Sequence, residues 1–455
     1  MTQTIKIKQG FNINLNGKAK KQISDADPPQ TYAIKPGDYL GIKRPKVLVQ
    51  VGDNVKAGTP VLHCKMMEQV KYTAPVSGEV IDIVRGEKRK LLEIKILADR
   101  KIEYVTHKKF SQADLEGISR DQASALMCAS GVWPHIIQRP YGIVANPEDV
   151  PRDIFISAFD SHPLAPDMDF MLEGEEEYIR FGIGILKKFT SGQVYVTVNA
   201  DDGGSKLFSG VSNASMNSIS GPHPAGNVGV QIHHIKPINK GDIVWTTTPY
   251  GLSQIGRLFM DGKYDPAKVI ALVGSEVRDP QYYRTRTGIH LEKLLEGKLK
   301  SDNVRVISGN VLTGERVDQK GYMGFYDNLI SVIPEGNRHE FLGWMRPTFE
   351  WLSFHRAIGL LSFMNSRNKE YVLTTNTRGD KRAFVQTGVF EKVLPMDIYP
   401  SYLFKSIMAE DYDEMEALGI YEVIEEDVAL CEFVDVSKHN LQQLVRKGLD
   451  LLQTS

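Results

Sequence analysis

Tight turns recur at short intervals through the first hundred residues, and they limit the possible fold more than any other feature. Short apolar runs, such as 46–51 and 79–84, are separated by Gly-Asp, Ala-Gly and Ser-Gly turns. This alternation predicts that residues 1–105 form an all-β domain. The chain has 455 residues, more than one core supports, so two to four domains are expected.

Two hairpin motifs outline this β domain. Val51-Gly-Asp-Asn-Val-Lys-Ala-Gly58 is followed by Thr73-Ala-Pro-Val-Ser-Gly78. Together they resemble the flattened barrel of biotinyl and lipoyl carrier domains, in which a modified lysine sits at a hairpin tip. Lys65 is the candidate here, but its spacing to Pro75 is longer than in the carriers, and a lysine at a tip is most often simply solvated. We favour an unmodified barrel. A carrier protein modified with biotin or lipoate at Lys65 is the alternative function.

The next segment, 106–255, has a strand–helix–strand pattern. A helix is expected at about 119–130, with a capping box of Ser119 and Gln122 and a stop at Gly131. Apolar strands at 154–159 and 193–198 flank a helix at 175–189, which predicts a parallel sheet. The loop 160–163 then lies at the carboxyl edge, where such sheets bind ligands.

The last two segments differ in pattern. Residues 256–335 are mixed, with strands near 269–273 and 304–307 around a short helix at 291–295. The segment 336–455 is mixed at first and mainly helical beyond about 400. The final helix is expected to be capped by Ser437 and to carry an apolar stripe of Leu441, Leu444, Val445, Leu449 and Leu452.

The sequence lacks the motifs that bind several common cofactors. The three cysteines, Cys64, Cys128 and Cys431, form no C-x-x-C pair, so cysteine alone cannot hold a zinc ion or an iron–sulfur cluster. No G-x-G-x-x-G occurs, and bulky residues occupy 129–142, where a phosphate cradle needs glycine. We therefore expect no flavin, dinucleotide or cluster on this chain. For Trp133 and Tyr141, core packing and a pocket wall remain alternatives.

The histidines do not predict a metal site. Pro222-His-Pro224 is expected to be a stiff turn, and His233 and His234 point to opposite faces if they lie on a strand. Asp160 and His162 are assigned to a turn.

Charge and hydropathy limit the partners and the location. The 55 basic and 56 acidic side chains nearly cancel, which argues against nucleic-acid binding. No run of about eighteen apolar residues occurs, so attachment to a membrane is expected to come through partners. The first ten residues lack the apolar core of a signal peptide, and the sparse cysteines fit a reducing cytoplasm.

Read in order, short motifs along the whole chain resemble one family, the A subunit of the bacterial sodium-translocating NADH:quinone reductase. The shared stretches are 51–56, 71–75, 85–89, 130–133, 139–141, 163–165, 221–226, 305–309, 311–314 and 395–397. Each is weak alone, and the ordered set is specific. The family usually has a second cysteine four residues after the first near the C-terminus, and this chain has Asp435 there, after Cys431.

The resemblance implies the fold and the role. It implies a biotinyl/lipoyl-like barrel (1–105), a Rossmann-like α/β domain related to the flavoprotein subunit of complex I but without its flavin loop (106–255), a β-grasp module of the SLBB type (256–335) and a C-terminal region that becomes helical (336–455). The implied role is that of a peripheral subunit on the cytoplasmic face of the bacterial inner membrane, packed against the B subunit in the membrane. NADH, flavins and quinone would react in other subunits of this sodium-exporting respiratory complex.

Quinone handling is the remaining expectation. An apolar quinone ring needs aromatic or aliphatic walls and one hydrogen-bond donor at a carbonyl. The candidate contacts are Arg139, Pro140 and Tyr141, together with Asp38, Tyr39 and Leu40 in the loop 37–41. Arg139 is the expected donor.

Overall fold

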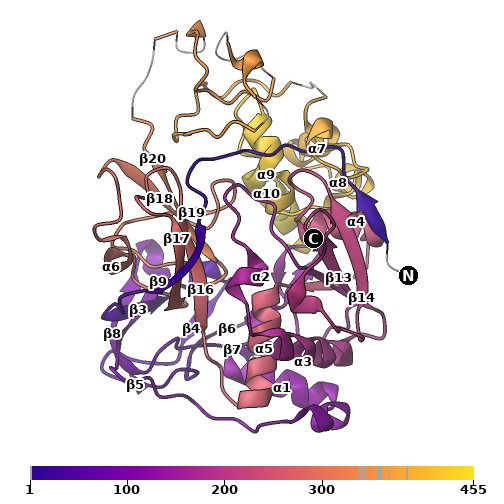
Figure 1. Ribbon diagram of the computed structural model, residues 1–455. Coiled ribbons are helices and arrows are strands. Elements are labelled where there is room, and N and C mark those ends of the chain that lie inside the picture. Colours follow the sequence, from indigo (N-terminus) through magenta and orange to yellow (C-terminus); the bar gives the residue numbers. More distant parts are fainter. Residues whose placement is uncertain are drawn as a thin grey trace.

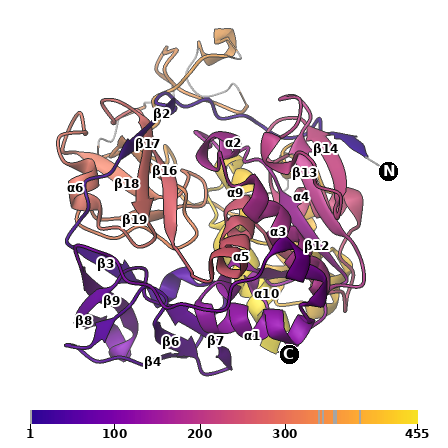
Figure 2. The same ribbon diagram turned by 60° about the horizontal axis from the view of Figure 1, so that its bottom comes forward.

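A computed structural model describes residues 3–337, 341–342, 345–355, 361–366, 368–385 and 388–454. Its described strands form four sheets, two of which make up a flattened barrel. Figure 1 shows the barrel at the bottom, a strand-rich domain above it on the left, an α/β domain on the right and the C-terminal helices at the upper centre and upper right. Figure 2 separates the first three of these bodies more clearly. The fold is mixed α/β, as predicted.

The barrel consists of two antiparallel sheets. One has the order β3 (Thr31–Ile34), β9 (Leu91–Ala98), β8 (Gly78–Arg85) and β5 (Asn54–Val55), and the other β4 (Pro45–Val47), β6 (Pro60–Cys64) and β7 (Met67–Thr73). The predicted Ser-Gly turn requires glycine at position 78, because Gly78 has φ +149° and a Cβ there would lie 1.9 Å from the Leu97 carbonyl oxygen. Side chains of both sheets are buried in the barrel, including Val61, Val70 and Ile94.

The α/β domain has a seven-stranded sheet. Its order is β1 (Thr4–Lys6), β14 (Ser215–Ser220), β13 (Val194–Asn199), β12 (Asp153–Ser157), β15 (Val244–Thr247), β10 (Ile137–Arg139) and β11 (Ile143–Val144). The predicted strand pair is parallel, with Ile154 opposite Val194. Helices α1 (Arg120–Ser130), α3 (Glu176–Leu186), α4 (Val228–Ile235) and α5 (Pro249–Asp261) belong to this domain, which also contains the short α2 (Met168–Met171). The capping box of Ser119 and the left-handed Gly131 are confirmed.

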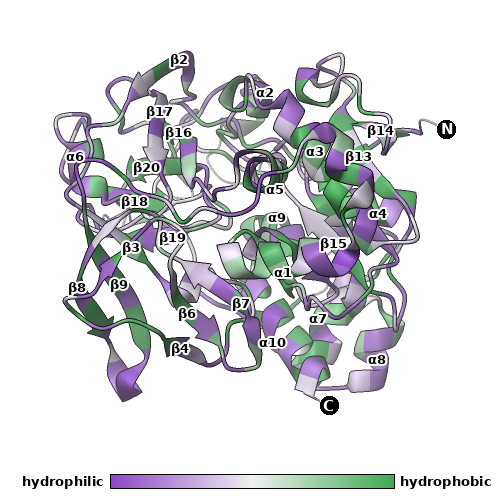
Figure 3. Cartoon of the chain, turned by 90° about the horizontal axis from the view of Figure 1, so that it is seen from below, coloured by the Kyte–Doolittle hydropathy of each residue, from purple (hydrophilic) through white to green (hydrophobic). Residues whose placement is uncertain are grey.

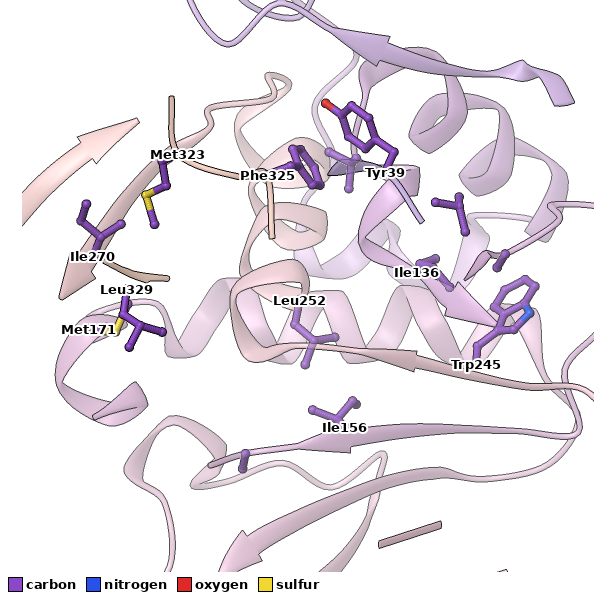
Figure 4. Close-up of a cluster of buried hydrophobic side chains, with 14 of the residues drawn as sticks. Tyr39, Ile136, Ile156, Met171, Trp245, Leu252, Ile270, Met323, Phe325 and Leu329 are labelled. Atoms are coloured by element: carbon purple, nitrogen blue, oxygen red, sulfur yellow. The ribbon is translucent and has the colours of Figure 1, made fainter. Parts of the chain in front are cut away.

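The third domain has one mixed sheet of six strands. The order is β19 (Glu315–Val317), β18 (Val304–Ser308), β20 (Leu329–Pro334), β16 (Ala267–Val273), β17 (Gln281–Arg286) and β2 (Lys20–Asp25). The short helix α6 (Leu291–Leu295) lies where the sequence predicts it. One continuous apolar core joins this domain to the other two, and Figure 4 shows residues of all three meeting in it.

The first residues of the chain do not stay with the barrel. Strand β1 pairs in parallel with β14 of the α/β domain, and β2 pairs in parallel with β17 of the third domain. We call residues 3–25 the N-terminal strap. The β domain expected at 1–105 includes these residues. Their partner strands lie about 210 residues further on for β1 and about 260 for β2, and no local pattern marks such a pairing.

The C-terminal helices are α7 (Pro400–Ala409), α8 (Tyr412–Ala417), α9 (Glu425–Val434) and α10 (Leu441–Thr454). The predicted apolar stripe of α10 is real, with Leu441, Val445 and Leu449 fully buried. The predicted cap is wrong, because α10 begins at Leu441 and Ser437 lies in the preceding turn. There Asp435 accepts the backbone N–H groups of Ser437 and His439. Figure 3 shows apolar and polar residues alternating along these helices.

Candidate functional site

The segment with the candidate quinone contacts is a hairpin. Strands β10 and β11 pair in antiparallel fashion, and Pro140, Tyr141 and Gly142 form the connection. The Arg139–Pro140 peptide is cis, and Tyr141 has a φ of +81°. Trp133, just before the hairpin, is fully buried and donates from its indole nitrogen to the Ala145 carbonyl, 2.7 Å away. Trp133 is therefore core.

Arg139 binds the C-terminal helices. Its side chain is 1% exposed, with Nη1 2.7 Å from Asp427 Oδ2 and Nη2 2.5 Å from Glu426 Oε1. Both carboxylates lie in the first turn of α9. Burial raises the pKa of Glu426, because water no longer solvates the charged form. The Arg139 contact with quinone stays a prediction; in this structure both terminal nitrogens donate to carboxylates, and the side chain ties the hairpin to α9.

A second arginine repeats the connection. Arg446 of α10 donates to the Tyr141 carbonyl over 2.8 Å and pairs with Glu425. The Tyr141 ring packs edge-on against Tyr421, with centroids 6.2 Å apart. The hairpin is thus held from two helices at once.

The loop 37–41 contains the other candidate contacts and adjoins the hairpin. The Val144 amide of β11 donates to the Leu40 carbonyl over 3.0 Å. Tyr39 is 5% exposed, and its ring centroid lies 4.3 Å from that of Tyr72 and 4.7 Å from that of Phe325. Figure 4 shows Tyr39 and Phe325 facing each other between domains. The structure therefore brings the two predicted segments together along one border.

A small hollow opens beside this aromatic cluster. It is lined from the barrel, the end of the α/β domain and the third domain, by Ala33, Ile34, Lys35, Asp38, Tyr39, Thr73, Pro75, Tyr264, Thr287, Gly288, Met323 and Phe325. Asp38 pairs with Lys35 over 3.0 Å and accepts the Phe325 amide. Burial raises the pKa of Asp38 to about 6. The hollow has aromatic walls and one buried ion pair.

A buried lysine in contact with the Phe325 carbonyl was not predicted from the sequence. Lys268 lies in β16, and its amine donates to the carbonyls of Phe325 (3.1 Å) and Asp327 (2.5 Å). Burial lowers the pKa of Lys268 to about 8. The available signal was a charged residue at the start of the apolar run 269–273.

The carboxyl edge of the parallel sheet also gathers polar groups. His162 Nδ1 lies 2.5 Å from Asp160 Oδ1, and its ring centroid is 4.7 Å from that of His223. Burial opposes protonation, but Asp160 raises the pKa of His162 overall, whereas burial lowers the pKa of His223 to about 3. His223 lies in the predicted Pro-His-Pro turn, which is confirmed, and the pairing with His162 was not foreseen.

The remaining candidates are placed as follows. His233 and His234 lie in helix α4, not on a strand. His233 pairs with Glu422 over 2.7 Å, and His234 Nε2 lies 2.9 Å from the Pro395 carbonyl oxygen. Lys65 and its neighbour Met66 form the two-residue tip between β6 and β7 and are exposed. Within the described part of the chain, the three cysteines are buried and unbridged, and no cluster of three His, Cys, Asp or Glu side chains is arranged to bind a metal.

These domains and their order define a class of protein, a chain of a barrel-sandwich hybrid, an α/β domain and an SLBB-type module. Family descriptions match each part: "NqrA N-terminal barrel-sandwich hybrid domain" at 5–99, "NqrA second alpha/beta domain" at 118–264 and "NQRA C-terminal domain" at 269–319.

Curated relatives match over nearly the full length. The A subunit of the Na(+)-translocating NADH-quinone reductase of Hahella chejuensis (strain KCTC 2396) is 36% identical over 99% of both chains. The protein of the same name from Serratia proteamaculans (strain 568) is 35% identical, also over 99% of both. The chain belongs to this family of A subunits.

A solved NAD+-reducing NiFe-hydrogenase is similar at a TM-score of 0.38 and 11% identity, covering 76% of this chain and 68% of that one. A likeness of that size supports no conclusion. Among the described residues, no helix combines the length and apolarity that crossing a bilayer requires.

Proposed function

We propose that this chain is the A subunit of a sodium-exporting respiratory NADH:quinone reductase, located on the cytoplasmic face of the bacterial inner membrane and held there by the B subunit in the membrane. The observation that carries the proposal is the 36% identity over 99% of a chain with that name. The four-part division belongs to the same proposal, with boundaries at 105 and 335, but its second boundary moves from 255 to beyond Asp261, because α5 runs unbroken to that residue. The Rossmann-like kinship of the α/β domain and the helical C-terminal region are also part of the proposal.

The chain binds no flavin or cluster of its own in this proposal. Val132, Trp133 and Ile136 are fully buried where a flavin loop would need glycine, so backbone N–H groups have no open approach to a phosphate there. Hydride transfer, electron transfer and sodium transport then belong to other subunits. The function of this chain is to hold those subunits in position.

The test is co-purification. Membranes from cells that express the whole complex are solubilised in detergent, and a tagged form of this chain is recovered with its partners. Recovery of the B subunit and of NADH:quinone reductase activity is expected. A tagged chain that stays with the soluble fraction, without partners, would refute the proposal.

The border between the loop 37–41 and the β10–β11 hairpin is the proposed place of quinone handling. Tyr39 and Phe325 provide aromatic walls, Leu40 is 40% exposed, and Lys35 beside Asp38 is a donor for a quinone carbonyl. Arg139, Pro140 and Tyr141 form the other side of this border through the Leu40–Val144 hydrogen bond. Titration of a short-chain quinone into the pure chain measures quinone binding at this border, separately from the co-purification test.

One observation favours the second candidate, a swinging-arm carrier. Lys65 and Met66 occupy an exposed two-residue hairpin tip on a barrel of the carrier type. The intact mass of the protein decides, since biotin or lipoate adds a fixed mass at Lys65. We expect the unmodified mass.

A further inference from the structure

The long connection between β20 and the C-terminal helices stands away from the body of the molecule. It spans residues 335–389 and is drawn in orange at the top of Figure 1. Its described part contains a 3-10 turn at 362–364 and no α-helix or β-strand. Connections of this length without regular structure are uncommon inside compact domains and usually serve a function.

This connection is anchored on its inner side. Tyr371 exchanges backbone hydrogen bonds with the N-terminal strap, donating to the Asn14 carbonyl and accepting from the Asn16 amide. Phe354 packs edge-on against Phe11 of the strap, with centroids 5.2 Å apart. Trp351 is 5% exposed beneath the Arg378 guanidinium, which lies 3.9 Å from the ring centroid. Buried aromatic residues therefore fix where the connection runs.

Other described residues of the connection present large apolar side chains to solvent. We call this set the apolar face. Its members are 44–95% exposed: Phe341, Leu342, Met345, Phe349, Phe363 and Met364. Isolated apolar residues on a surface need no explanation, but six within 24 residues of chain indicate a contact with another apolar phase.

The net charge of this stretch of sequence indicates which apolar phase the face contacts. Residues 338–382 contain eight arginine and lysine residues and four acidic ones, a net charge of +4 in a chain whose total is −1. Lys381 and Arg382 are exposed near the end of this stretch. Aromatic and aliphatic side chains combined with excess basic charge suit the boundary of a bilayer with anionic headgroups, where rings enter the interface and cations remain at the phosphates. A protein partner would need its own acidic surface, whereas anionic lipid supplies one everywhere.

We propose that the apolar face binds directly to the surface of an anionic phospholipid bilayer, so that this chain contacts lipid as well as its partner subunits. The proposal rests on the membrane location proposed above. It adds a direct contact with lipid, although no helix among the described residues could span a membrane.

The experiment is sedimentation of the full chain with vesicles of phosphatidylglycerol and phosphatidylcholine mixed, or of phosphatidylcholine alone. The wild type is expected to sediment with the anionic vesicles, more weakly with the neutral ones, and less as salt rises. Phe341→Ser/Phe363→Ser is expected to weaken anionic binding by roughly tenfold or more, because two large rings of the apolar face no longer insert. Both positions are exposed, so the fold should persist, which a melting curve checks.

The matched control is Met66→Ser/Val150→Ser, which removes two apolar residues that are 74% and 58% exposed on other surfaces. It should bind like the wild type. No sedimentation of the wild type with anionic vesicles, or equal binding by both double variants, would overturn the proposal. Loss of co-purification by Phe341→Ser/Phe363→Ser without any vesicle binding by the wild type would assign the face to a protein partner instead. Neither result bears on the proposed function. That function is tested separately, by recovery of the partner subunits with the wild-type chain.

Discussion

Replacing Arg139 by alanine should destabilise the protein strongly. The substitution leaves Asp427, whose side chain is fully buried, and Glu426, whose side chain is 33% exposed, without their cation. Removing one partner of a buried ion pair costs about 3–5 kcal/mol, because an uncompensated charge remains in a medium that solvates it poorly. Protonation of Glu426, whose pKa burial already raises, relieves part of that cost. For a cooperative unit of roughly 150–250 residues the melting temperature falls by roughly 6–20 °C.

Thermal melting followed by circular dichroism measures this effect, with the exposed Arg100→Ala as control. A second arm tests the cause. Arg139→Met/Asp427→Leu removes both charges of the fully buried pair and should recover much of the lost stability, since apolar replacement of a buried pair is often neutral. A melting temperature of Arg139→Ala within about 2 °C of the wild type, together with a roughly ten- to hundredfold loss of quinone affinity, would refute this reasoning and assign Arg139 to ligand binding.

Four further outcomes are expected. Asp38→Asn should gain stability relative to the wild type by roughly 2–3 kcal/mol between pH 4 and pH 7, because the folded-state pKa is raised to about 6 and the wild type loses stability as pH rises through that range; melting curves at both pH values show it. Gly256→Ala should cost about 1–3 kcal/mol or more in urea unfolding, since its Cβ would lie 2.0 Å from the Tyr178 carbonyl oxygen, whereas Gly117→Ala, with no atom within 4 Å, should not. Tyr39→Leu should weaken binding of a short-chain quinone by about threefold to tenfold through loss of ring contacts, and unchanged titration curves would exclude the border. Lys65→Arg should leave the intact mass changed only by the substitution itself.

Local signals in the sequence predicted the elements that local interactions determine. Ser119 and Gln122 form their capping box within one turn, and α6 occupies the predicted residues. The prediction that Ser437 caps α10 was wrong for a reason that is also local. Asp435, at the place of the missing second cysteine, organises the turn that delays the helix to Leu441.

Contacts between distant residues could not be predicted in this way. Arg139 lies 287 and 288 positions from its carboxylate partners, so its sequence surroundings suggested an available donor. His162 and His223 meet only because the parallel sheet brings two carboxyl ends together. The two candidate segments were chosen as quinone contacts, which stays a prediction; the hydrogen bond from Val144 to Leu40 that places them side by side depends on the packing of separate domains.

The N-terminal strap has a consequence for how the chain is made. Its strands leave the ribosome long before their partners, because β1 pairs with residues 218–220 and β2 with residues up to 284. Neither pairing is available until nearly half of the chain or more has been synthesised, and parallel pairing over such separations is intrinsically slow. The strap therefore stays unpaired during most of synthesis and completes two sheets as a late step. The α/β domain and the third domain then finish folding together, and neither is expected to fold when it is expressed without the strap. A bulky tag fused directly to the first residues would impede that closure, whereas α10 offers the safer end.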